Sequence, residues 1–174
     1  MRKIRNVLLF IMTAVFLTGC AENPYKSGVN ALEDGDYSKA AEEFMTAIEK
    51  EKNLADSYRG LGISLWEQGT YEDALKAFES AISEGTKESA TIYSLMGNCS
   101  MQVSKYDKAA EYYEMALTMK DISEELVQEV EYNLIAAYEY AGELEQAKEQ
   151  VSKYVEKYPD EEAALREAGF LETR

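Results

Sequence analysis

The sequence predicts an all-α solenoid of about four helix-turn-helix repeats, closed by a C-terminal capping helix. Small residues recur at intervals of 34, 35 and 38, at Ala40, Ala74, Ala109 and Ala147. Within each unit, apolar residues are spaced i, i+4 and i+7, as they are on one face of an α-helix. A turn residue separates the two helices of each unit. These turn residues are Gly35, Gly69, Ser104 and Gly142.

The segment 1–19 has the composition of a secretory signal. Arg2, Lys3 and Arg5 give it a basic start, and residues 7–17 are almost entirely apolar. As a helix, this apolar run is about 16 Å long at ~1.5 Å per residue, roughly half of a hydrocarbon layer of ~30 Å. We therefore predict a signal peptide that is removed.

The end of this segment, "LTGC", resembles the lipobox of bacterial lipoproteins: an aliphatic residue, two small residues and a cysteine. The resemblance implies cleavage before Cys20 and a diacylglyceryl group on its sulfur, so that the chain is a membrane-anchored lipoprotein at an extracytoplasmic face. One acyl chain binds a membrane with only on the order of 10⁴ M⁻¹, and two or more make the anchor stable. The alternative is an uncleaved short signal anchor in which Cys20 has no role.

The composition excludes several classes of function. Without residues 1–19, the remaining 155 residues include 15 basic and 33 acidic side chains, a net charge of −18. Such a chain has no electrostatic route to nucleic acid, and anionic lipid head groups repel it. It has no histidine, and Cys99 is its only other cysteine, so we expect no metal and no cofactor. Gly60-x-Gly62 lacks the remaining features of a dinucleotide loop, and nothing indicates an enzyme.

The length of residues 20–174 fits one domain. We place the repeats at about 21–54, 55–88, 90–123 and 124–161, with the capping helix at 161–172. The first helices of the first three repeats carry a glycine where the two helices cross closely, and the second helices carry a large ring. The glycines are Gly28, Gly62 and Gly97, and the rings are Phe44, Phe78 and Tyr113.

Two repeats depart from this pattern. Pro24 predicts that the first helix of repeat 1 starts late. In repeat 4, Ile135 replaces the glycine, which predicts a wider crossing. Four extra residues predict a longer first helix, started by a capping box of Asp121 and Glu124. Asp160 is the expected N-cap of the last helix, which either continues through Gly169 or ends there.

The repeats resemble the tetratricopeptide repeat over about residues 21–161. The resemblance implies that the first helices line a concave groove that binds a protein or peptide. It places these groove residues: Tyr25, Val29, Leu32, Arg59, Ile63, Trp66, Asn98, Met101, Tyr132 and Tyr140. The Lys/Asn/Arg clamp for a C-terminal carboxylate found in some members is missing, because Tyr25 and Val29 stand at its opening positions.

We expect the partner to be a protein segment with apolar anchors and basic flanks, in an envelope process such as secretion or pilus assembly. Trp66, the only tryptophan, either binds this segment or packs against a neighbouring repeat. One alternative is a module for a small molecule or a cell-wall glycan; a closed pocket bounded by Trp66, Tyr132 and Tyr140 would favour it, and an open groove would count against it. Another is a self-associating structural lipoprotein. The sequence leaves the oligomeric state open.

Overall fold

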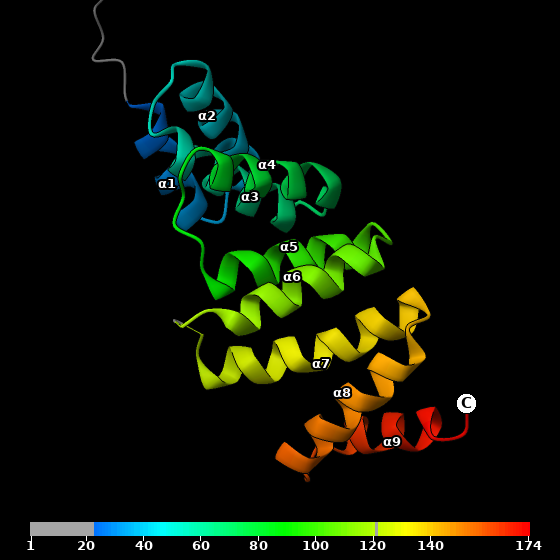
Figure 1. Cartoon of the computed structure of the whole chain (residues 1–174). Coiled ribbons are helices and arrows are strands. Elements are labelled where there is room, and N and C mark those ends of the chain that lie inside the picture. The colour runs from blue at the N-terminus through cyan, green and yellow to red at the C-terminus, as the bar shows by residue number, and fades with distance from the viewer. Residues whose placement is uncertain (1–22, 121) are drawn as a thin grey trace, which may run out of the picture.

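The computed structural model describes residues 23–120 and 122–174, so the predicted signal peptide and Cys20 lie outside the described residues. The described residues form nine helices and no strand, which confirms the all-α solenoid (Figure 1). The helices are α1 (Pro24–Glu33), α2 (Tyr37–Glu49), α3 (Leu54–Glu67), α4 (Tyr71–Ser83), α5 (Ala90–Gln102), α6 (Tyr106–Thr118), α7 (Glu124–Ala141), α8 (Leu144–Lys157) and α9 (Glu162–Leu171). Within the described ranges, no helix is both long enough and apolar enough to cross a membrane.

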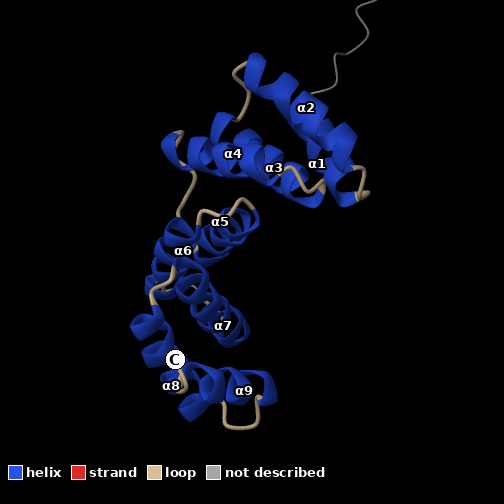
Figure 2. Cartoon of the chain, turned by 90° about the vertical axis from the view of Figure 1, so that its right-hand side faces the viewer, coloured by secondary structure: helices blue, strands red, loops and turns tan. Residues whose placement is uncertain are grey.

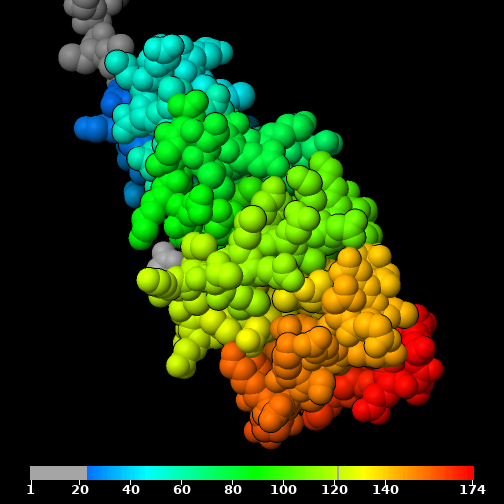
Figure 3. Space-filling model, in the orientation of Figure 1, coloured from blue at the N-terminus to red at the C-terminus, as the bar shows by residue number. Residues whose placement is uncertain are grey.

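The helices stack in chain order along an arc. Figure 2 shows α3, α5, α7 and α9 on the inner side of the arc, with α4, α6 and α8 behind them. Each helix packs against the next one along the chain, and the space-filling view shows the successive repeats as successive bands (Figure 3). The first helices α1 and α3 also touch, as do α5 and α7, whereas α3 and α5 lie farther apart.

A glycine facing an aromatic ring joins the two helices of each of the first three repeats. A Cβ atom added at any of these glycines would lie within 3 Å of the ring, so no larger residue fits without a shift. The pairs are Gly28 with Phe44, Gly62 with Phe78, and Gly97 with Tyr113. All three rings are fully buried. The close helix crossing predicted from the repeat pattern is therefore present.

Gly60 has a separate role that the repeat pattern did not reveal. A Cβ atom at Gly60 on α3 would lie 2.4 Å from Cζ of Phe44 on α2. Phe44 therefore lies between Gly28 of its own repeat and Gly60 of the next one. In the Gly60-x-Gly62 sequence, Gly60 thus contacts Phe44 of the preceding repeat, and Gly62 contacts Phe78 of its own repeat.

The turn between the two helices of each repeat contains one residue in the left-handed region. Its φ angle is 74° at Gly35 and at Gly69, and 81° at Gly142. Ser104 occupies the same position in repeat 3 with a φ angle of 59°. An L-residue other than glycine adopts this conformation at a cost.

The first and fourth repeats depart from the others as the sequence predicted. Helix α1 has only 10 residues and starts at Pro24, whereas α7 has 18. Ile135 is buried in the crossing of α7 and α8, and Figure 1 shows α8 turned away from α7. The predicted capping box is wrong. Ser123 is the N-cap of α7, because its Oγ accepts a hydrogen bond from the backbone N–H of Leu126 at 3.2 Å. Asp121 itself lies outside the described residues.

Helix α9 is the predicted cap. Its buried residues, Ala164 and Leu171, join the apolar cluster that contains Ile135 and Tyr154, so α9 covers the apolar end of the last repeat. The helix continues through Gly169, where an added Cβ would meet nothing within 4 Å. The N-cap predicted at Asp160 is wrong by one residue. The chain is still in a turn there, and Glu161 occupies the N-cap position.

Candidate binding groove

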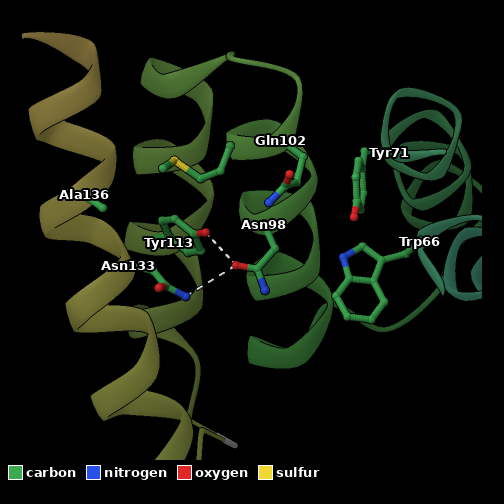
Figure 4. A pocket seen from close by; sticks show the side chains of 8 residues that line it. Trp66, Tyr71, Asn98, Gln102, Tyr113, Asn133 and Ala136 are labelled. Carbon is green, nitrogen blue, oxygen red and sulfur yellow. Dashed lines mark hydrogen bonds between the residues drawn. The ribbon is translucent and has the colours of Figure 1, made fainter. Parts of the chain in front are cut away.

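A hollow of about 310 Å³ opens on the array where α3 and α5 lie farther apart. We call it the central hollow. Its lining residues are Trp66, Tyr71, Asn98, Met101, Gln102, Tyr113, Asn133 and Ala136. Figure 4 shows Trp66 and Tyr71 on one side, facing Asn98 and Gln102 on the other. None of its lining side chains is charged, so it combines aromatic surface with amide groups.

Hydrogen bonds orient the Asn98 amide at the floor of the central hollow. The Tyr113 hydroxyl donates to Asn98 Oδ1 at 2.6 Å, and Asn133 Nδ2 lies 3.5 Å from the same oxygen (Figure 4). Burial raises the pKa of Tyr113, so its hydroxyl keeps its proton at neutral pH. The carbonyl side of Asn98 is therefore occupied. Its Nδ2 donates to no group in the described part of the chain and is available to a ligand.

The structure brings together three of the predicted groove residues, since Trp66, Asn98 and Met101 line the central hollow. Ile63 stays close to them, packed against the same apolar cluster as Trp66 and Met101. The remaining lining residues are Gln102 and Ala136, which also lie on the first helices of their repeats, and three that the sequence prediction missed: Tyr71, Tyr113 and Asn133. The signal for Asn133 was its position one helical turn before Ala136, which puts both on one face of α7.

The predicted residues of repeat 1 lie away from the central hollow. Tyr25, Val29 and Leu32 pack against the N-terminal apolar cluster, with the Tyr25 ring 6.2 Å from that of Phe44. Arg59 is exposed on α3, and its Nη2 lies 3.0 Å from Asp56 Oδ1.

The two predicted tyrosines of repeat 4 occupy different places. Tyr140 is 66% exposed and stacks on Tyr106, with the ring centroids 5.2 Å apart. Tyr132 lines a second hollow, between α7, α8 and the start of α9. Trp66 and Tyr132 thus line different hollows, and Tyr140 lines neither of them. This arrangement counts against the closed small-molecule pocket that would favour the glycan alternative.

The second hollow has a volume of about 320 Å³, and we call it the tyrosine hollow. It is lined by Glu125, Gln128, Glu129, Tyr132, Asn133, Tyr154, Glu161 and Ala163. Asn133 lines both hollows, so the two are neighbours along the inner side of α7. Together they form a groove that changes from neutral to acidic toward the C-terminus.

Two of the titratable groups outside the hollows, Cys99 and Glu139, have pKa values that bear on the chemistry of the chain. Burial raises the pKa of the Cys99 thiol to about 12, which leaves no thiolate for nucleophilic chemistry at neutral pH. Glu139 on α7 faces the capping helix, and its Oε1 is buried with no donor among the described residues. Burial, and then the neighbouring Glu167 of α9, raise the pKa of Glu139 to about 7 against a smaller opposing effect of Arg174. In the described ranges, no three His, Cys, Asp or Glu side chains are arranged so that they could hold a metal ion.

The stacked helix pairs and the groove on their inner side define a helical-repeat scaffold for protein interactions. The chain belongs to the tetratricopeptide-repeat family: one family model matches residues 25–89 and 59–122, and a second matches 129–161.

Curated relatives include the photosystem I assembly protein Ycf3 of two Synechococcus strains, CC9311 and CC9605. Each is 26% identical over 101 residues, which is 53% of this chain and 58% of the relative. The chain thus spans little more than half the length of these relatives.

Solved structures show the same fold. YrrB, described as a TPR protein with an unusual peptide-binding site, matches with a TM-score of 0.72 and 19% identity over 85% of this chain and 74% of YrrB. A MamA structure matches with a TM-score of 0.71 and 19% identity over 85% of this chain and 78% of MamA. MamA of Desulfovibrio magneticus RS-1 matches with a TM-score of 0.70 and 20% identity over 87% of this chain and 82% of MamA.

Proposed function

We propose that this protein is a lipid-anchored scaffold that binds a protein segment in its groove at the extracytoplasmic face of a bacterial membrane. The central hollow carries the groove part of this proposal. It offers a segment the aromatic surfaces of Trp66 and Tyr71, and it offers the amide of Asn98 as a donor to a backbone carbonyl. Aromatic anchors surrounded by a few oriented polar groups are typical of peptide-binding sites.

The chemical character of the proposed partner segment follows from the same surface. A segment with apolar anchors suits the neutral central hollow, and basic flanking residues suit a scaffold whose residues 20–174 have a net charge of −18. The peptide-binding site described for YrrB and the assembly role in the name of Ycf3 are consistent with a partner that is a protein. We propose an envelope assembly process, such as secretion or pilus assembly, as the setting. The scaffold itself performs no catalysis.

The groove is tested by a variant that replaces one donor group with an acceptor of the same shape. Asn98→Asp keeps the oxygen that accepts from Tyr113 but removes the Nδ2 donor from the central hollow. A photo-crosslinker at Gln102, on the rim, captures the partner in cells. A synthetic peptide of the captured segment is then titrated while the emission of Trp66, the only tryptophan, is recorded.

We expect saturable binding that Asn98→Asp weakens about 10-fold or more, because a lost hydrogen bond to a desolvated group costs about 1–3 kcal/mol. Asn30→Asp makes the same change on the exposed face of α1, so it serves as the matched control and leaves the affinity unchanged. Trp66→Ala has no tryptophan, so its affinity for the peptide is measured by calorimetry. If the peptide binds Asn98→Asp and Trp66→Ala as tightly as it binds the unaltered protein, the groove is not its site.

The anchor is tested separately. We propose that Cys20 becomes the first residue after cleavage and carries the lipid. Growth with an alkyne-bearing fatty acid is expected to label the protein and to leave it in the membrane fraction, whereas Cys20→Ser removes the label. Unchanged labelling of Cys20→Ser would rule out this attachment point.

A further inference from the structure

We propose that the tyrosine hollow binds the guanidinium group of an arginine side chain in the segment that occupies the groove. This inference rests on the proposed function, because the arginine belongs to the segment bound at the central hollow. It gives the predicted basic flank of the partner a place and a chemical identity.

The wall of the tyrosine hollow is one face of α7. Five of its lining residues follow one another at helical spacing, so their side chains point to the same side. They are Glu125, Gln128, Glu129, Tyr132 and Asn133. Tyr154 of α8 and the residues at the start of α9 close the opposite side. The capping helix is therefore part of this site as well as a cover for the apolar core.

Aromatic rings form one surface of this hollow. The Tyr132 and Tyr154 ring centroids lie 5.6 Å apart at an interplanar angle of 52°, and Tyr154 lies 4.7 Å from Tyr158. Tyr132 remains 37% exposed, so its ring is accessible from the groove. The face of an aromatic ring attracts a cation placed within about 6 Å of its centroid.

The neighbouring Tyr158, which lines the adjoining hollow, holds a cation in this manner. Lys157 Nζ lies 5.1 Å from the Tyr158 ring centroid and 3.0 Å from Glu131 Oε1. A tyrosine ring and a carboxylate thus share one ammonium group at the edge of this region. Lys157 lines the adjoining hollow, together with Glu125 and Gln128, and its ion pair is with Glu131 and not with a carboxylate of the tyrosine hollow.

The charge of the hollow selects a cation. Three carboxylates, those of Glu125, Glu129 and Glu161, line it without a basic side chain. Gln128 Nε2 donates to Glu161 Oε1 at 2.9 Å, which fixes this carboxylate across the hollow from α7. Hydrogen bonds from its own backbone N–H and from Ser123 lower the pKa of Glu125 and keep it ionised.

Arginine suits this lining better than lysine does. Its planar guanidinium group stacks on a tyrosine face and presents several N–H donors to carboxylates at the same time, whereas the ammonium of lysine is a compact and strongly hydrated charge. The position of the hollow fits a continuous segment, because Asn133 lines this hollow and the central hollow. An apolar anchor on Trp66 and an arginine farther along would occupy both.

The experiment titrates the full chain, in neutral detergent with ¹³C-labelled tyrosine rings, with N-acetyl-arginine amide. The citrulline analogue, which has nearly the same shape and no charge, and N-acetyl-lysine amide are titrated in parallel. We expect the arginine probe to shift the Tyr132 and Tyr154 ring signals saturably, at least threefold more tightly than the lysine probe. The citrulline probe is expected to leave these signals in place.

The double variant Glu129→Gln/Glu161→Gln is expected to weaken binding of the arginine probe at least 10-fold. The matched control is Glu42→Gln/Glu49→Gln, which removes two exposed charges from α2, far along the array. It is expected to change the affinity less than twofold. Equal binding of the arginine and citrulline probes, equal binding of arginine and lysine, or an equal loss in both double variants would overturn the inference.

The outcome separates this inference from the proposed function. If the captured segment still changes Trp66 emission while the arginine probe leaves Tyr132 unaffected, only the arginine site is wrong. If the arginine probe binds but no segment binds at Trp66, the tyrosine hollow is a cation site and the groove proposal fails.

Discussion

The substitution Gly60→Ala tests how successive repeats pack. The new Cβ atom would lie 2.4 Å from Cζ of Phe44, where an ordinary contact is 3.4–4 Å. Phe44 is 1% exposed and has Gly28 on its other side, so it has little room to move. Overpacking a core costs about 1–3 kcal/mol, and alanine in a helix recovers about 1 kcal/mol relative to glycine. The difference is a net loss of about 0–2 kcal/mol, and because the overlap is at least about 1 Å we expect a value at the upper end, about 2 kcal/mol.

Urea unfolding followed by circular dichroism measures this loss. Gly169→Ala is the matched control, because its Cβ meets nothing within 4 Å, and it is expected to gain about 0.5–1 kcal/mol from helix propensity alone. Phe44→Leu, which gives the new methyl group room, should cost less in the Gly60→Ala background than in the unaltered protein. A Gly60→Ala protein as stable as the Gly169→Ala protein would refute the proposed packing of Phe44 between two repeats.

Two further predictions concern the turns between helices and the contact of α7 with the capping helix. Ser104→Gly is expected to raise the free energy of unfolding by about 1 kcal/mol, because it relieves a positive φ angle of a residue other than glycine. The reverse change, Gly35→Ser, should lower the free energy of unfolding. Equal stabilities of these variants and the unaltered protein would contradict this account of the turns. The pKa of Glu139 is raised to about 7 in the folded state, so the unfolded chain ionises first and stability falls as pH rises from about 4.5 to 7. Glu139→Gln, which can donate to Glu167, should remove this fall and be more stable by about 1–2 kcal/mol at pH 8, after allowance for partial exposure. Urea unfolding at pH 5 and pH 8 measures the stability gain of Glu139→Gln, with Glu42→Gln as an exposed control. A gain that is the same at both pH values would contradict the raised pKa of Glu139.

The repeat pattern predicted the helices and their pairing well, because the residues that decide them lie within one repeat. Gly97 and Tyr113, for example, stand at fixed positions of two consecutive helices, and any chain that pairs these helices must bring them together. The signals at helix ends were weaker. Several polar residues near the start of α7 and α9 qualify as N-caps, and backbone geometry selected Ser123 and Glu161 over Asp121 and Asp160.

The sequence by itself determined the fold, the number of repeats, the acidic character and the order of residues along the inner surface. It placed the groove residues in one line from Tyr25 to Tyr140. Only the tertiary structure placed four of these residues in two hollows, Trp66, Asn98 and Met101 in one and Tyr132 in the other, and left the rest outside both. The reason is that α3 and α5 lie apart and that the amides of Asn98 and Asn133 meet across α5 and α7. The rotation of each repeat on the next is set by contacts such as Gly60 with Phe44, between residues of different repeats. A pattern within a single repeat does not contain that information.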